Sequence, residues 1–77
     1  MEEIIKDYYG WVIGYIENKP NGDRIAKDFS RRILGWYEKA TNVTKDFSLR
    51  IVARGDVTSG LIWSAYQEEQ KKRGNNH

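Results

Sequence analysis

The stretch KDYYGWVIG at residues 6–14 returns as KDFSRRILG at residues 27–35 and as KDFSLRIVA at residues 45–53. The copies share a Lys-Asp-aromatic start and an apolar pair, which is followed by Gly or Ala. The links between the copies differ in length, as is typical of supersecondary units joined by variable loops. The sequence therefore predicts one structural unit built three times.

Each copy is predicted to form a β-hairpin whose tight turn follows an aspartate. An Asp side chain can accept hydrogen bonds from the backbone just ahead of it and so hold a bend. Asp7, Asp28 and Asp46 occupy this position, and Gly10 follows in the first turn. β-Branched and aromatic residues concentrate in the flanking arms, as strands prefer. The first arms are expected at residues 3–8, 24–29 and 42–47, and the second arms at 12–17, 32–38 and 50–57.

The segment TSGLIWSAYQEEQKKRG, which begins at Thr58, predicts an amphipathic helix over residues 59–73. Leu61, Ile62 and Ala65 fall on one side, and acidic residues precede basic ones, as the helix dipole favours. The apolar side needs a sheet or a second subunit to pack on. We therefore expect a mainly β (α+β) domain. It consists of a meander of about six short antiparallel strands over residues 1–57, a C-terminal helix over 58–73 and a frayed tail over 74–77.

An all-helical bundle is the alternative fold. Ile25, Phe29 and Ile33 are spaced as on one face of a helix. However, Gly14 and Gly35 would each cost about 1 kcal/mol inside a helix. The pattern favours the β meander, and the helical bundle remains the alternative fold.

Length and composition indicate a small intracellular domain. With 77 residues the chain is close to the lower limit for a single core, and without cysteine it has neither disulfides nor thiolate metal sites. An aromatic fraction of 13% compensates with large side chains to bury. No apolar run approaches the roughly 18 residues that cross a bilayer, and the start MEEIIKDYY does not read as a signal sequence. We expect a cytoplasmic protein with no membrane partner.

The repeat resembles that of small bacterial β-repeat proteins of unknown function, called β-flower-like, in which Asp-aromatic-aromatic-Gly-Arg-apolar-apolar-Gly recurs. The resemblance spans about residues 3–57 and implies a curled meander of hairpins. The turn glycine of that pattern is Gly10 here, with Arg31 and Leu49 in the matching places, and Ala53 replaces the final glycine of the third copy. The resemblance implies no catalytic residues.

The sequence contains no recognisable catalytic constellation, and we do not expect an enzyme. The three repeated aspartates could form a carboxylate set that binds a cation. Each follows a Lys and precedes a turn, so a structural role is favoured. The serines lack an internal histidine partner, because the only histidine is His77 at the chain end. We therefore predict no catalytic residue, no cofactor and no metal site.

Self-association is predicted from the second arms of the hairpins. Strict alternation places Val12, Gly14 and Ile16 on one side of the sheet. Ile13 and Tyr15 then fall on the other side, so both faces are partly apolar and one needs a partner. We therefore expect a small structural or protein-interaction module that forms a homodimer and binds an unidentified protein.

Weak nucleic-acid binding is the alternative function. Arginines in or after the turns lie close in sequence to aromatic residues that could stack on bases. The net charge of +2 supplies little attraction for phosphates. The residues expected at an interaction surface of either kind are Trp11, Tyr15, Arg31, Arg32, Trp36, Arg50, Arg54 and Trp63.

Overall fold

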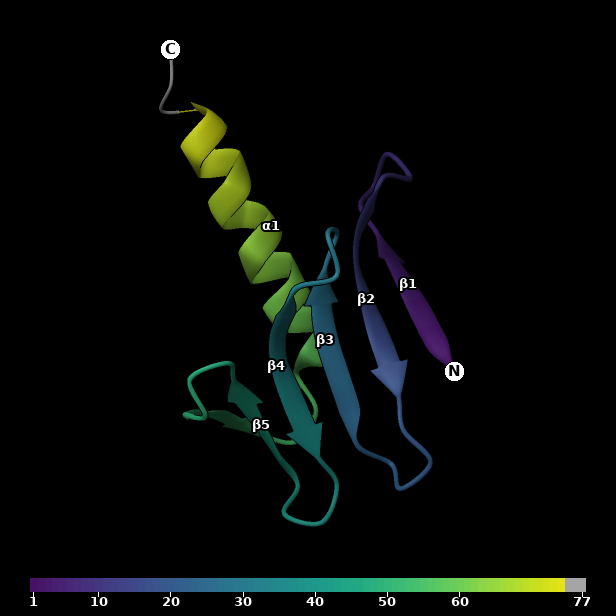
Figure 1. Ribbon diagram of the computed structural model, residues 1–77. Helices are drawn as coiled ribbons and strands as arrows, with labels where there is room; N and C mark the ends of the chain where they lie inside the picture. Colours follow the sequence, from purple (N-terminus) through teal and green to yellow (C-terminus); the bar gives the residue numbers. More distant parts are fainter. Residues whose placement is uncertain (75–77) are drawn as a thin grey trace.

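The computed structural model, which describes residues 1–74, is a six-stranded antiparallel sheet followed by a helix (Figure 1). The strands lie side by side in chain order. Their bounds are β1 Glu2–Lys6, β2 Val12–Asn18, β3 Arg24–Asp28, β4 Ile33–Glu38, β5 Val43–Asp46 and β6 Ile51–Arg54, and α1 spans Thr58–Gly74. The predicted α+β meander is confirmed, and the all-helical alternative is wrong. Of the predicted frayed tail, Gly74 ends α1, and residues 75–77 lie outside the described residues.

The three hairpin turns share one hydrogen-bond pattern. In each, the Oδ1 atom of the aspartate accepts the backbone N–H groups of the residues two and four positions later, at 2.9–3.1 Å. The residue three positions after the aspartate adopts a left-handed φ, which is 87° at Gly10, 69° at Arg31 and 69° at Leu49. Glycine fits this conformation freely, whereas the two larger residues are held in it by the turn.

Each hairpin also contains a β-bulge at the same place in the repeat. Shifts in register leave one extra residue in the second strand, at Ile13, Leu34 and Val52. A bulge interrupts the alternation of side chains along a strand. Ile13 consequently joins Ile16 in the buried core beneath the helix. The strict alternation predicted for residues 12–16, which placed Ile13 on the opposite side from Ile16, is therefore wrong.

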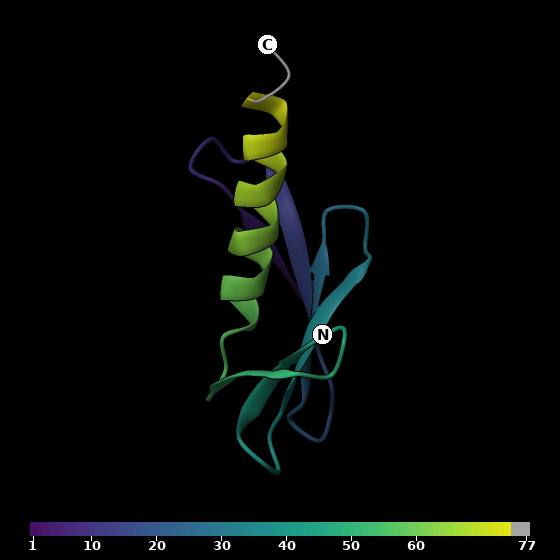
Figure 2. The same cartoon turned by 90° about the vertical axis from the view of Figure 1, so that its left-hand side faces the viewer.

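Helix α1 lies across one face of the sheet and packs against β2, β3 and β4 (Figures 1 and 2). Small residues allow this close approach. A Cβ atom built on Gly14 would lie 2.5 Å from the Ile62 side chain, and one built on Gly35 would lie 2.6 Å from Leu61. Ala26, which is fully buried, pairs with Gly35 in the sheet. The glycine near the end of the first two repeat copies therefore makes room for the helix.

Arg24 fixes the start of α1 to the first hairpin. Its guanidinium donates to Glu3 Oε2 in β1 at 2.5 Å, to Asn18 Oδ1 in β2 at 2.9 Å, and to Asp56 Oδ2 just before the helix. Asp56 Oδ1 in turn accepts the backbone N–H of Thr58 at 3.0 Å and its hydroxyl at 2.6 Å. This network determines where the helix begins.

The sheet face away from α1 carries cross-strand ion pairs. Lys27 bonds Glu17 at 2.9 Å, and Lys45 lies 3.3 Å from Glu38. Trp36, half-buried, pairs with Lys45 in the sheet. Charged and apolar side chains alternate along the strands on this face. Within residues 1–74, no helix combines the length and the hydropathy that crossing a bilayer demands.

Replacing Gly14 with alanine should lower the free energy of unfolding by about 1–3 kcal/mol, the usual cost of overpacking a filled core. The added Cβ would overlap Ile62 and the carbonyl oxygen of Lys27. Gly60→Ala is the matched control, because a Cβ in that helical position meets nothing closer than 3.9 Å. It should raise the free energy of unfolding by up to about 1 kcal/mol. Urea unfolding followed by circular dichroism measures both, and changes of the same sign would contradict the packing argument.

Candidate functional site

A groove of about 630 Å³ lies between the C-terminal half of α1 and the tips of the first two hairpins. Figure 1 shows why it forms there: α1 continues beyond the sheet, while the turn between β1 and β2 stands apart from it. The helix contributes one wall, between Ala65 and Gln70. The turns of the β1–β2 and β3–β4 hairpins contribute the other. A smaller hollow of about 210 Å³ lies beside Ile25, Trp36 and Lys45.

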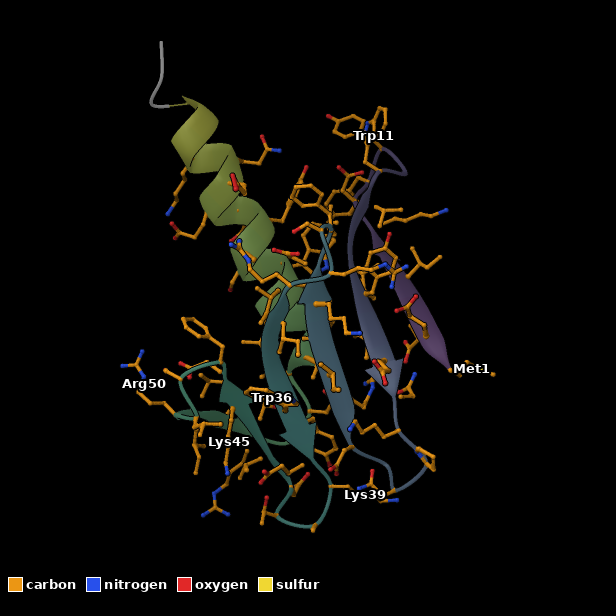
Figure 3. The ribbon with its side chains drawn as sticks, in the orientation of Figure 1. Met1, Trp11, Trp36, Lys39, Lys45 and Arg50 are labelled. Carbon is orange, nitrogen blue, oxygen red and sulfur yellow. The ribbon has the colours of Figure 1, made fainter. Side chains whose placement is uncertain are left out.

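The hairpin wall of the groove is aromatic. Tyr9, Trp11 and Phe29 line it and are 86%, 73% and 59% exposed. Trp11 projects from the tip of the first hairpin (Figure 3). Ile13 and Leu34, the bulge residues of the first two hairpins, also line the groove and connect it to the core. The turns thus expose large aromatic rings to water beside an apolar floor. This exposure costs free energy unless a ligand covers the rings.

A hydrogen bond ties the two walls together. The hydroxyl of Tyr66 in α1 donates to Asp7 Oδ2 in the first hairpin turn at 2.9 Å. Trp63, one turn earlier in α1, meets the Tyr66 ring edge-on at 5.8 Å between centroids and the Tyr8 ring tilted at 5.6 Å. These contacts fix the distance between the helix and the first hairpin, and with it the width of the groove.

The hydrogen bonds to Asp7 also keep its carboxylate ionised. Partial desolvation raises the pKa of Asp7, but the backbone N–H of Trp11, the hydroxyl of Tyr66 and the backbone N–H of Tyr9 lower it more. The net pKa is below the usual value for an aspartate. The groove therefore keeps this negative charge at neutral pH.

Asp28 and Asp46 are held in the same way by their own turns. Desolvation raises the pKa of Asp28, but the backbone N–H of Arg32 and the hydroxyl and N–H of Ser30 lower it below its usual range. The hydroxyl of Ser48 is the main cause of the lowered pKa of Asp46. The three aspartates do not converge, and within residues 1–74 no group of three or more His, Asp or Glu side chains could hold a metal ion. Each carboxylate serves its own turn.

The residues predicted for an interaction surface are divided among several places. Figure 3 shows Trp11 at one end of the molecule, well separated from Trp36 and Arg50. The groove is lined by Trp11 and Arg32, and Trp63 packs beside it. The others lie elsewhere: Tyr15 in β2, Trp36 in β4, Arg31 in the second hairpin turn, and Arg50 and Arg54 at β6. The sheet does not bring these eight residues together.

Three of the four predicted arginines bond carboxylates. Arg31 donates to Glu2 at 2.6 Å and stacks 3.9 Å above the ring of Tyr15. Arg32 donates to Asp28 at 3.3 Å, and Arg50 lies 3.5 Å from Asp46. Each of these pairings offsets part of the positive charge that would attract the phosphates of a nucleic acid.

The groove contains residues that the sequence reasoning missed. The sequence places Phe29 in a strand, or on one face of the alternative helix, although it directly follows a turn aspartate and turns lie at the surface. The position of an aromatic residue beside a predicted turn was the available signal. The contribution of α1 had no such signal, because it depends on the direction in which the helix leaves the sheet. The lining residues outside the predicted interaction and turn residues are Tyr9, Val12, Ile13, Phe29, Leu34, Ala65, Tyr66, Glu68, Glu69 and Gln70.

Comparisons of this chain with protein-family models, with curated proteins and with solved structures found no match. The geometry of the groove is therefore the basis for assigning a function. The resemblance to β-flower-like repeat proteins stays a prediction.

Stability should fall as the pH is lowered below the unfolded-state aspartate pKa of about 3.9. The folded-state pKa values of Asp7, Asp28 and Asp46 are lowered. Their contribution to stability is therefore present above the unfolded-state pKa and is lost as the pH falls through the folded-state pKa values.

Asp28→Asn should lower the free energy of unfolding at pH 7 by about 1–2 kcal/mol, because charge-assisted hydrogen bonds become neutral ones.

Urea unfolding of the wild type and of Asp28→Asn across this acidic range measures the effect. The variant should lose less stability than the wild type between neutral and acidic pH. Parallel pH profiles for the two proteins would contradict the assignment.

Proposed function

We propose that this protein is a small protein-interaction module that holds a segment of another protein in the groove beside α1. The observation that carries this proposal is the concentration of Tyr9, Trp11 and Phe29, all exposed, around one groove. Large apolar patches on small proteins mark interaction sites, and aromatic residues supply most of the binding energy at such interfaces. The proposed role is non-catalytic and cytoplasmic, and it uses no cofactor or metal.

The rigidity of the groove supports a binding role. Asp7 and Asp28 lock the two hairpin turns that present the rings, and Tyr66 locks the helix to the first turn. A ligand would therefore lose less free energy in ordering these turns than it would on a mobile loop.

Self-association through a sheet edge is the second candidate. β6 ends the sheet and exposes Ile51 and Val52, which are 63% and 46% accessible. The outer edge of a strand offers backbone groups with which a second copy could pair. Light scattering at high protein concentration tests this candidate: a dimer mass that returns to the monomer mass in Val52→Lys supports it, and a monomer mass in the wild type removes it.

Nucleic-acid binding has less support than either. Arg31, Arg32 and Arg50 form ion pairs with carboxylates, and Trp11 lies well apart from Trp36 and Arg50 (Figure 3). A titration with single-stranded oligonucleotide at low salt, followed by tryptophan fluorescence, would show quenching if this alternative held.

Selection of a random peptide library, displayed on phage, against the immobilised protein should enrich peptides that need the groove. Binding of these peptides should weaken at least about tenfold, or 1.4 kcal/mol, in Trp11→Ala and in Phe29→Ala. Phe47→Ala is the matched control, because Phe47 occupies the same repeat position as Phe29, is 73% exposed and does not line the groove. Failure to enrich any peptide, or equal losses in Phe29→Ala and Phe47→Ala, would remove the proposed function.

A further inference from the structure

The groove is acidic, although the whole chain has a net charge of +2. Four carboxylates line it, those of Asp7, Asp28, Glu68 and Glu69, and they face one guanidinium, that of Arg32. Arg32 donates to Asp28 Oδ2 at 3.3 Å, so this charge is directed at the second hairpin turn. The lining therefore holds more negative than positive charge.

The helix carboxylates and the exposed hairpin rings lie on opposite walls. Glu68 and Glu69 belong to the helix wall, and Tyr9, Trp11 and Phe29 belong to the hairpin wall. A cation between these walls would meet carboxylates on one side and aromatic rings on the other. Both attract a Lys ammonium or an Arg guanidinium, the rings through the cation–π interaction.

The floor of the groove suits a different chemical group. Val12, Ile13 and Leu34 line it, and the last two pack into the core or against it. Contacts of this kind favour an apolar side chain of the ligand. A volume of about 630 Å³ is in the range of sites that enclose small ligands, and it suits a few side chains of a peptide.

We infer that the partner is a basic, apolar peptide segment, in which a Lys or Arg lies next to large apolar side chains. This inference rests on the proposed function and deepens it. The apolar side chains occupy the floor, and the basic side chain lies between the rings and the helix carboxylates. The same negative charge disfavours acidic peptides and nucleic-acid phosphates at this site.

The test uses the peptides enriched by selection on the wild-type protein. They should contain more Lys and Arg than Asp and Glu. One of them is synthesised in three versions: unchanged, with its Lys and Arg replaced by Gln, and with them replaced by Glu. Fluorescence anisotropy at low salt should show binding at least about tenfold weaker for the Gln version, a difference of one decade in Kd, and weaker still for the Glu version.

The double variant Glu68→Gln/Glu69→Gln should weaken binding of the unchanged peptide by a similar factor and leave the Gln version almost unaffected. Glu17→Gln/Glu38→Gln is the control, because it removes the same charge from the sheet face away from α1. Circular dichroism establishes that both variants are folded.

Four outcomes would overturn the inference. Enriched peptides without a basic excess, or equal affinity of the Lys/Arg and Gln versions, would do so and leave the proposed function intact. Equal effects of the two double variants would show that net charge acts without the groove. If the selection enriches nothing and the protein instead sediments with anionic lipid vesicles through Trp11, the aromatic rim is a membrane contact and the proposed function fails as well.

Discussion

The close contact between α1 and three small residues of the sheet holds this molecule together. A single-layer sheet of six short strands has one apolar face to bury, and in the described chain one helix covers it. That helix reaches the sheet only because Gly14, Ala26 and Gly35 leave space for Ile62 and Leu61. In a domain of this size, where the core is small, such a contact accounts for much of the stability.

The groove follows from the same contact. The small residues lie in the central strands, so α1 packs with its first half, and its second half continues beyond the strands (Figure 2). The bond from Tyr66 to Asp7 then holds the departing helix near the first hairpin. The packing that stabilises the fold therefore also creates a space between the helix and the hairpin tips, where exposed aromatic rings collect.

The repeat predicts the fold well because it describes local chemistry. Aspartate turns, strand arms and their order depend on residues that are neighbours in the chain, and all appear in the structure. The environment of each copy depends on how the helix packs, and the repeat pattern does not determine it. Phe29 and Phe47 occupy one repeat position, yet Phe29 lines the groove and Phe47 does not. The sequence does not reveal the bulge at Ile13, because residues 11–16 are a continuous run of apolar residues and glycine, in which an extra residue breaks no visible alternation.

For a related reason, the net charge of the chain does not indicate the charge of the groove. The excess of two positive charges describes the whole chain, but the structure separates charge locally. Lys27 and Arg31 are balanced by Glu17 and Glu2 through bonds between strands or turns. The groove, in contrast, collects carboxylates from two hairpin turns and from α1, segments that are far apart in the sequence. A weakly basic chain can therefore present an acidic groove, and a proposal about a partner has a better basis in the groove than in the composition.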